Sequence, residues 1–391
     1  SASMKTLISL ASVSFIFLFC ITVSISDVWK KKNRIRIIKT QDCEVFEGKW
    51  VWDNVSRPLY EEWECPYMHK YTACETSGRP DTMYKNWRWQ PNDCSLERFD
   101  AQKMLRILRG KTMMFVGDSV QRNQFDSLVC LIQSVIPDEK KSFRKVPPSM
   151  KVFTMEVRYA FVLQCIYFNN FIQEFNASIA FYWAPFLVSS ISDDADDHGG
   201  AEKLVYLDSI SSHGEKWKTA DILVFNSHLW WSENPSLPCV FNGKKTTYSS
   251  ADAYEIAMKT WENWVKKNLN HRTQRTFFMG TSPTHWGSSG LPGSHGNCHK
   301  KSLPSFSKNL GDDINTRMEQ IVREELGVTY MDITRLSQYR IDAHTSYYGK
   351  FSKLRKKSGM NTSSKKYGDC LHWCLPGVPD TWNELLFHFM L

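Results

Sequence analysis

The stretch that most constrains this chain is Lys111–Pro137, with the sequence KTMMFVGDSVQRNQFDSLVCLIQSVIP. Its apolar run Met113–Val116 predicts a short buried strand, and Gly117–Ser119 predicts the turn that ends this strand. The apolar residues that follow recur at helical spacing, namely Phe125, Leu128, Val129, Ile132 and Val135. One face of a helix is therefore expected to be buried. The stretch predicts a strand–turn–helix unit, a building block of α/β folds.

Ser119 occupies a special place in this unit, between the carboxyl end of a strand and the first turn of a helix. Ligands of open α/β sheets bind at that edge, and the free N–H groups of a helix start can stabilise an anionic intermediate. An ordinary turn in which Asp118 or Ser119 caps the helix explains the same residues. Ser119 is thus a candidate nucleophile whose support depends on partners elsewhere in the chain.

Those partners are offered near the C-terminus by Tyr367–Gly377, YGDCLHWCLPG, in which Asp369 precedes His372 by three positions. On a helical turn this spacing places both side chains on one face. A serine nucleophile needs a base to accept its proton and a carboxylate to orient that base. A surface ion pair is the alternative explanation. The rival bases, for which structural roles are expected, are His285, His295, His299 and His344, the last in Asp342-Ala-His344.

The order of the remaining elements predicts the fold class. Strands expected at 221–225, 277–280 and 328–333 alternate with helices expected at 253–269 and 314–326, after a first helix expected at 96–108. Such alternation indicates a mostly parallel sheet covered by helices on both faces. With 391 residues, of which 42% are hydrophobic, the chain is long enough for one large domain with an elaboration.

The pairing of GDS at Gly117 with DCLHWCLPG at Asp369 resembles the plant trichome-birefringence-like proteins, which are polysaccharide O-acetyltransferases related to GDSL/SGNH esterases. The resemblance extends from Cys43 to Phe387. Further matching segments are CPYM at Cys65, NWRWQPNDC at Asn86, FYWAPFLV at Phe181, ADILVFNSHLWW at Ala220, DAHTS at Asp342 and DTWNELLF at Asp380.

This resemblance implies an SGNH/GDSL-like three-layer α/β/α core with Ser119 as the nucleophile, His372 as the base and Asp369 as the orienting acid. SGNH enzymes place an asparagine at a strand end in the oxyanion hole, so Asn226 is a candidate by analogy, and an Asn that caps a loop is the alternative. Gly117 and Arg122 are further oxyanion-hole candidates. The implied organisation is a catalytic domain at 43–391, divided into a Cys- and Trp-rich subregion at 43–96 and the SGNH-like core at 97–391.

The N-terminal residues predict a membrane anchor. Ser1–Ser3 before Met4 resemble a cloning remnant that, with a short tail, ends at residue 5, and residues 6–26 form an uncharged run long enough to span a bilayer. A cleaved signal peptide is the alternative. Residues 27–42 form a basic stem, and residues 1–40 carry +6 of the net charge of +8. The other residues lack a basic field, so no nucleic-acid partner is expected. The cysteine spacing predicts no metal.

Eleven cysteines predict disulfides in an oxidising compartment, and the zinc alternative lacks a pair of CxxC motifs. The family resemblance implies the bridges Cys43–Cys94, Cys65–Cys130, Cys74–Cys374 and Cys298–Cys370. Sequons at Asn54, Asn176 and Asn361 are consistent with glycosylation in the secretory lumen. The unpaired cysteines are then Cys20, Cys165 and Cys239, and Cys165 falls in an apparent insertion relative to the family at 160–175.

Trp and Arg side chains near residue 80 are candidates for a glycan-binding wall, because flat rings and forked donors suit sugar rings and hydroxyls. The residues are Arg79, Trp87 and Arg88, with Trp89 beside them, and core packing is the alternative.

The function implied by the resemblance is a xylan O-acetyltransferase that forms an acetyl-Ser119 intermediate. No bound cofactor is expected. An acetyl donor is required, either acetyl-CoA or an acetylated intermediate, and xylan or a related hemicellulose is the acceptor. The location implied is the Golgi membrane, as a single-pass type II protein with a luminal catalytic domain. Two alternatives stay open, namely an acetylesterase with the same triad and a catalytically silent protein that binds wall glycans.

Overall fold

The centre of the fold is a seven-stranded sheet in the order β12-β11-β8-β3-β6-β5-β4. In this computed structural model the described residues are 43–156, 176–196, 203–233, 235–285, 298–299, 301–305, 328–349 and 368–391. The pairings from β12 through β6 are parallel, and those of β5 and β4 are antiparallel. The strand bounds are β3 Thr112–Gly117, β4 Lys141–Val146, β5 Met150–Met155, β6 Ala177–Trp183, β8 Ile222–Phe225, β11 Arg275–Met279 and β12 Thr329–Met331. The predicted mostly parallel sheet is confirmed.

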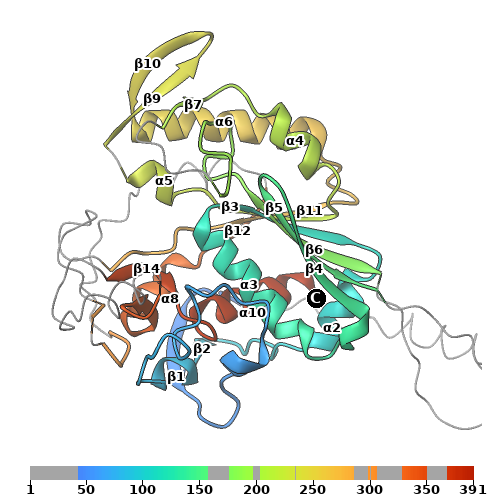
Figure 1. Ribbon diagram of the computed structural model, residues 1–391, viewed down its shortest axis with the longest axis vertical. Helices are drawn as coiled ribbons and strands as arrows, with labels where there is room; N and C mark the ends of the chain where they lie inside the picture. The colour runs from blue at the N-terminus through green and yellow to red at the C-terminus, as the bar shows by residue number, and fades with distance from the viewer. Residues whose placement is uncertain are drawn as a thin grey trace, which may run out of the picture. The chain divides into compact units, whose positions relative to one another are not determined.

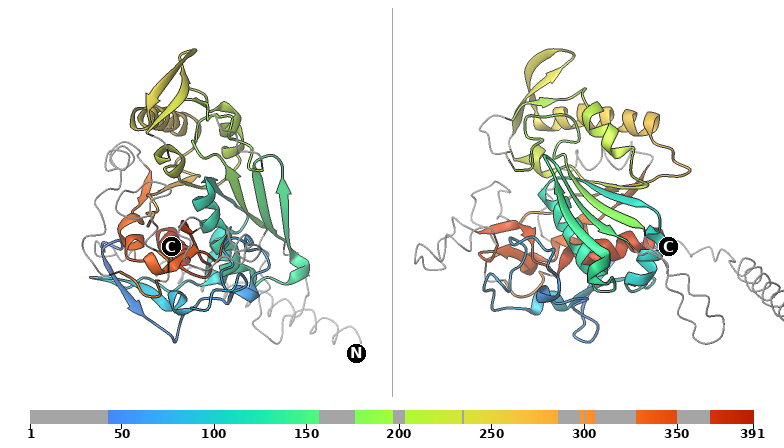
Figure 2. Two further views of the ribbon diagram at one scale, coloured as in Figure 1. Left: turned by 60° about the vertical axis from the view of Figure 1, so that its left-hand side comes forward. Right: turned by 45° about the vertical axis from the view of Figure 1, so that its right-hand side comes forward.

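Helices cover both faces of this sheet (Figure 1). On one face α3 packs its Phe125 ring against Phe115 of β3 at 6.2 Å. On the other face Trp261 of α6 contacts Phe225 of β8 at 5.0 Å and Phe278 of β11 at 5.3 Å. The helices α2 Ala101–Leu108, α3 Ser119–Gln133 and α10 Val378–Met390 lie on the first face, and α4 Ser211–Trp217 and α6 Ser250–Asn268 on the second (Figure 2). These are the three expected layers.

The segment before α2 is held to this core by aromatic packing and disulfides. Its two strands pair in antiparallel fashion and set Trp50 against Trp89, and its Tyr67 ring packs against Phe153 of β5 at 5.1 Å. Predicted bridges are present at Cys65–Cys130, Cys74–Cys374 and Cys298–Cys370. Cys43 and Cys94 are both disulfide-bonded. Among the described residues Cys239 is a free, buried cysteine.

Smaller elements complete the fold. The strands β1 Gly48–Trp52 and β2 Trp87–Pro91 form one small sheet, and β7 Val205–Tyr206, β9 Ser236–Phe241 and β10 Lys244–Ser249 form another. A third pairs β13 His344–Ser346 with β14 Asp369–Trp373. The short helices are α5 Leu229–Ser232, α8 Thr334–Gln338, η1 Glu62–Glu64, η2 Met83–Asn86, η3 Asp138–Lys140 and η4 Ile341–Ala343.

The predicted helix at 96–108 begins later than expected. Its first residue is Ala101, because the Asp100 side chain caps the helix by accepting the Lys103 backbone N–H. Within the described ranges no helix is long and apolar enough to cross a membrane. The predicted anchor at 6–26, the stem at 27–42, the insertion at 160–175 and the helix at 314–326 all fall outside those ranges.

Candidate active site

Ser119 is the first residue of α3, directly beyond the end of β3. Asp118 caps the helix, since its carboxylate accepts the Val120 backbone N–H at 2.8 Å. The helix-cap role anticipated for Asp118 is therefore real, and Ser119 stays partly exposed beside the cap. Burial raises the pKa of Asp118 to about 6.

The last residue of β3 must be small for this turn to form. A Cβ atom on Gly117 would lie 2.5 Å from the carbonyl oxygen of Asn226 on the neighbouring chain segment. We expect Gly117→Ala to lower the free energy of unfolding by about 1–3 kcal/mol, because backbone atoms must move apart. Activity should fall with it, since the displaced turn carries Ser119. Chemical denaturation and the rate of acetyl transfer measure the two effects.

Gly243→Ala is the matched control for this substitution. Gly243 also has positive φ, at 73°, yet nothing lies within 4 Å of an added Cβ atom. Its replacement is expected to cost about 1 kcal/mol of backbone strain with unchanged turnover. Equal turnover in both variants would contradict the close approach at Gly117.

Asp369 and His372 lie in a strand, so the expected helical turn was wrong. In regular β structure residues three apart face opposite sides. Here β14 pairs irregularly with β13, with Ser346 opposite Asp369 and His344 opposite Trp373. The Asp369 carboxylate also accepts the backbone N–H groups of Leu371 and His372, each at 3.0 Å. This side-chain-to-backbone turn brings the two side chains together where a regular strand would separate them.

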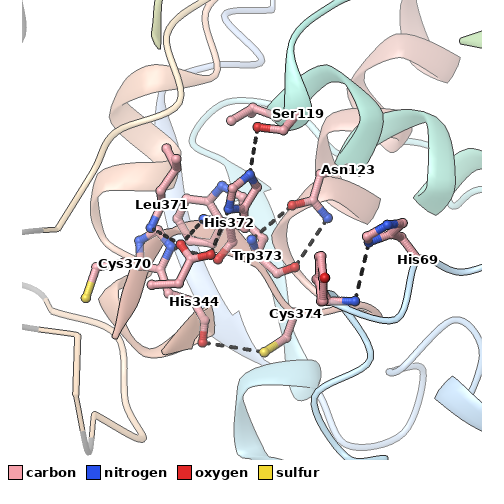
Figure 3. Close-up of polar contacts among 12 residues, drawn as sticks. His69, Ser119, Asn123, His344, Cys370, Leu371, His372, Trp373 and Cys374 are labelled. Carbon is pink, nitrogen blue, oxygen red and sulfur yellow. Dashed lines mark hydrogen bonds and ion pairs between the residues drawn. The ribbon is translucent and has the colours of Figure 1, made fainter. Parts of the chain in front are cut away.

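Ser119, His372 and Asp369 form a continuous hydrogen-bonded chain, of which Figure 3 labels Ser119 and His372. His372 Nδ1 lies 2.8 Å from Asp369 Oδ2, and His372 Nε2 lies 2.7 Å from Ser119 Oγ. A carboxylate can only accept from Nδ1–H, which leaves Nε2 as the acceptor for the serine hydroxyl. Burial alone would raise the pKa of Asp369, but the His372 charge and hydrogen bonds outweigh burial and lower it.

Asn123 connects α3, which carries Ser119, to β14, which carries His372. The sequence did not lead us to predict this role. Its Oδ1 accepts the Trp373 backbone N–H at 3.0 Å, and its Nδ2 donates to the Trp373 carbonyl at 3.2 Å (Figure 3). The signal was present in the sequence, because Asn123 follows Ser119 by four positions and shares its helix face. The Trp373 indole Nε1–H donates to Ser282 Oγ at 2.9 Å, which restrains the strand further.

The rival histidines have structural positions. His344 is buried, and its Nδ1 donates to the carbonyl oxygen of His372 at 3.1 Å. The His344 ring stacks on Trp373 at 3.9 Å. His344 Nε2 lies 2.6 Å from His285 Nδ1, and burial lowers the pKa of both imidazoles. His299 lies 2.8 Å from Ser346 Oγ, whereas His295 falls outside the described residues. The described rivals therefore support β13 and β14 without contacting Ser119.

The oxyanion-hole candidates differ in how available their donors are. Asn226 is buried and aims its Nδ2 at the carbonyls of Met279 and Gly280, at 3.2 and 3.3 Å. This places the Asn226 amide in a strand-end cap, the alternative role. Gly117 lies against the Asn226 backbone. Arg122 follows Ser119 by one helical turn and is partly exposed.

The glycan-wall candidates are largely occupied by protein contacts. Arg79 is buried, and its guanidinium donates to the carbonyls of His344 and Asp342 at 2.9 and 2.6 Å. Arg79 is therefore an internal anchor of β13, which corrects its predicted sugar contact. Trp87 packs edge-on against Trp52 at 5.4 Å in the β1–β2 sheet, in line with the packing alternative. Arg88 pairs with Asp53 at 3.2 Å and keeps a partly exposed side chain.

Two disulfides hold β14, the strand that carries His372, one from within the strand and one directly after it. Cys370 lies between Asp369 and His372 and is bonded to Cys298, and Cys374 at the end of this segment is bonded to Cys74. Cys298, His299 and Cys370 are a cluster of metal-type ligands among the described residues. Since both sulfur atoms belong to one disulfide, the cluster offers no thiolate for a metal.

We expect the double variant Cys298→Ser/Cys370→Ser to lose about tenfold to a hundredfold in rate. The reason is that a base displaced by about 1 Å loses on the order of a hundredfold. The matched control is Cys65→Ser/Cys130→Ser, because the two bridges close loops of similar length. The cysteines are 65 positions apart in the control and 72 positions apart in the Cys298–Cys370 bridge. Both variants should lose about 4 kcal/mol of stability from chain entropy. Calorimetry and kinetics on both variants are the measurement, and equal losses of rate would contradict the local effect.

A serine at a strand end that is hydrogen-bonded to a histidine, which in turn is hydrogen-bonded to an aspartate, on an α/β/α fold is the arrangement of a serine esterase. Residues 96–389 match the family described as PC-Esterase, the GDSL/SGNH-like Acyl-Esterase family found in Pmr5 and Cas1p. Residues 41–95 match the PMR5 N terminal Domain. The chain belongs to this acyl-esterase family, which confirms the resemblance drawn from its motifs.

The chain is also similar to curated plant proteins over most of its length. It is 46% identical over 361 residues to protein trichome birefringence-like 31 of Arabidopsis thaliana, covering 90% of this chain and 83% of that protein. It is 41% identical over 363 residues to probable xylan O-acetyltransferase 10 of Oryza sativa subsp. japonica, covering 88% and 77%. For rice xylan O-acetyltransferase 3 the identity is 38% over 364 residues, covering 88% and 75%.

Proposed function

We propose that this protein is a polysaccharide O-acetyltransferase with xylan as its acceptor. The observation that carries the proposal is the continuous chain from Ser119 Oγ through His372 to Asp369, at 2.7 and 2.8 Å. The family supplies the acyl-transfer chemistry. The rice relatives named xylan O-acetyltransferases, at 38–41% identity, support the acetyl group and the acceptor.

The reaction proceeds in two transfers through Ser119. His372 Nε2 accepts the proton of Ser119 Oγ while that oxygen attacks the carbonyl carbon of an acetyl donor. The bond to the leaving group breaks, the leaving group takes the proton from His372, and acetyl-Ser119 remains. A sugar hydroxyl then gives its proton to His372 and attacks the acetyl carbonyl. The bond to Ser119 Oγ breaks, and that oxygen takes the proton back from His372. Asp369 stabilises the imidazolium that forms in each half-reaction.

The negative oxygen formed in each step lies near the start of α3. The first N–H groups of a helix lack intrahelical acceptors and carry a partial positive charge. The Ser119 backbone N–H therefore acts as the oxyanion donor in this proposal. The Asn226 amide makes no such contribution while it donates to Met279 and Gly280.

Acetylesterase activity is the second candidate, because water can replace the sugar hydroxyl in the last transfer. Incubating the protein with an acetyl donor and xylo-oligosaccharide, followed by mass spectrometry, separates the two. A product heavier by one acetyl group is expected. Loss of donor without acetylated sugar would indicate an esterase, and no turnover would favour a silent wall-glycan-binding protein.

The cellular location belongs to the same proposal, with residues 6–26 as a type II Golgi anchor and the catalytic part in the lumen. Disulfides form and persist in oxidising compartments, and this chain has three described bridges. The sequons at Asn54 and Asn176 are exposed, whereas Asn361 falls outside the described residues. Sensitivity of the expressed protein to endoglycosidase tests luminal exposure.

A further inference from the structure

Two cationic side chains on α3 and β5 have no acidic partner within ion-pair distance among the residues that the structure describes. Arg122 is on α3, one helical turn after Ser119, and Lys151 is the second residue of β5. Both are partly buried, and in the part of the chain that the structure describes neither forms a side-chain hydrogen bond or an ion pair. Most other buried cations in this chain are paired, as Arg57 is with Glu384. Arg122 and Lys151 therefore need a separate explanation.

Strand pairing places Lys151 on the face of the sheet that α3 covers. Lys151 lies directly opposite Phe181 of β6, and directly opposed residues project to the same face. The Phe181 ring contacts Phe125 of α3 at 6.0 Å. Lys151 and Arg122 thus approach one another from a strand and from the helix packed over it.

A third donor, His69, reaches the same place from the N-terminal segment. The bridge Cys65–Cys130 ties this segment to α3, and the Tyr67 ring packs against Phe153 of β5 at 5.1 Å. Figure 3 shows His69 and His372 on either side of Asn123 in that view. His69 is also close enough to His372 for the two rings to interact electrostatically, and Arg122 follows Ser119 by one helical turn.

His69 can donate a hydrogen bond to a ligand from one nitrogen of its neutral ring. Burial, together with the positive charges of Arg122 and Lys151, lowers the pKa of His69 to about 3, so the ring is neutral. Its Nδ1 accepts the Tyr71 backbone N–H at 3.4 Å. The ring proton is consequently on Nε2, which is a third donor without a described acceptor.

The acids nearby do not neutralise the two cations. Asp126 is buried, and burial raises its pKa to about 6 although Lys151 and Arg122 act against that shift. Its carboxylate has no ion pair within 4 Å among the described residues. Asp118 is occupied as a helix cap, and the exposed Asp196 lies 3.8 Å from Lys145. Asp126 is therefore one carboxylate beside two cations and offsets only part of their charge.

Leaving such cations without a partner is unfavourable. Burial lowers the pKa of both Arg122 and Lys151, although the charge of the nearby Asp126 carboxylate acts in the opposite direction. A buried charge without a partner costs free energy that a bound counter-charge recovers. Guanidinium groups bind carboxylates and phosphates through parallel hydrogen bonds, and Lys adds a point charge. The donor set is therefore suited to a ligand that carries an oxyanion.

We propose that Arg122, Lys151 and His69 form a subsite that binds an anionic group of a substrate, a carboxylate or a phosphate, next to Ser119. This inference rests on the proposed acetyl transfer, because it assigns part of a substrate to that site. The group has two possible sources, an acidic sugar on the acceptor polysaccharide or the phosphates of a nucleotide thioester donor. In either case the subsite orients a substrate without taking part in bond making.

Direct binding tests the subsite without any turnover. The probes are glucuronate and inorganic phosphate, with uncharged xylose for comparison, measured by calorimetry on the full chain. Lys151→Gln is expected to weaken binding of at least one anion about tenfold, whereas Lys151→Arg retains it. Lys145→Gln is the matched control, because Lys145 lies directly opposite Lys151 on β4 and is exposed. Anion binding that is equal in wild type and Lys151→Gln would overturn the subsite.

Kinetics then identifies the source of the anion. Wild type and the same variants are compared with acetyl-CoA or a neutral aryl acetate as donor, and with xylo-oligosaccharides that do or do not carry glucuronic acid. Lys151→Gln should raise KM about tenfold for the one substrate that carries the relevant anion and leave kcat nearly unchanged. If the KM values of all four substrates stay as in Lys145→Gln, the proposal is wrong. Hydrolysis of the aryl acetate without sugar acetylation would refute the transferase proposal instead.

Discussion

Ser119→Ala is expected to abolish acetyl transfer, by about four to six orders of magnitude, while the melting temperature stays within a few degrees of wild type. The hydroxyl is the atom that forms the acetyl ester in the proposed mechanism, and loss of a triad nucleophile removes nearly all the covalent pathway. Ser119 is partly exposed, and its hydroxyl contacts His372. Removing one exposed oxygen should therefore cost little fold energy.

The measurement pairs the transfer rate with thermal unfolding on the same preparation. Mass spectrometry after incubation with the acetyl donor alone should show an acetyl adduct on wild type and none on the variant. Ser282→Ala is a matched control, because Ser282 is also partly exposed and, among the described residues, its hydroxyl accepts the Trp373 indole N–H without contacting His372. Near-normal turnover by Ser119→Ala would remove this serine from the mechanism.

His372→Ala is expected to lose about as much activity as Ser119→Ala, and Asp369→Asn roughly ten- to a hundredfold less. Without the imidazole no group accepts the serine proton. An asparagine retains the backbone contacts that Asp369 Oδ1 makes with residues 371 and 372. The amide N–H of this asparagine would, however, donate to His372 Nδ1, and the ring proton would then be on Nε2. A protonated Nε2 cannot accept the serine proton. A triad carboxylate generally matters less than its base.

Stability against pH gives an independent readout for Asp369. Its pKa is lowered in the folded protein from an ordinary 3.8. A lowered carboxyl pKa adds stability that is fully present above the unfolded pKa and is lost as pH falls toward the folded value. Asp369→Asn should thus reduce stability at neutral pH and converge on wild type in acid. An asparagine variant with full activity would remove Asp369 from the mechanism.

The local sequence already determined the central part of the fold. The apolar run before Gly117 and the helical spacing after it specified β3 and α3 to within a residue or two, because both elements bury regular patterns. Strands alternating with helices were sufficient to predict a mostly parallel sheet. Ser119 at the strand end followed from the same periodicities, and family motifs added Asp369 and His372.

Tertiary structure decided how those residues meet. The Asp-x-x-His pair lies in a strand, since β14 is held by β13 and by the Asp369 contacts to its own backbone, and no local pattern encodes that pairing. The sequence made Arg79 a candidate sugar ligand. In the folded chain Arg79 is buried and donates to the carbonyls of residues 342 and 344.

Tertiary structure likewise decided that Arg122 and Lys151 lie on one face of the sheet. Sequence shows charge but not separation, so the approach of Arg122 to Lys151 became visible only when β5 paired with β6 beneath α3. The sequence by itself therefore determined the elements and the reactive side chains. Their distances, partners and burial required the folded chain, because Ser119 and His372, which are 253 positions apart, must come within hydrogen-bonding distance.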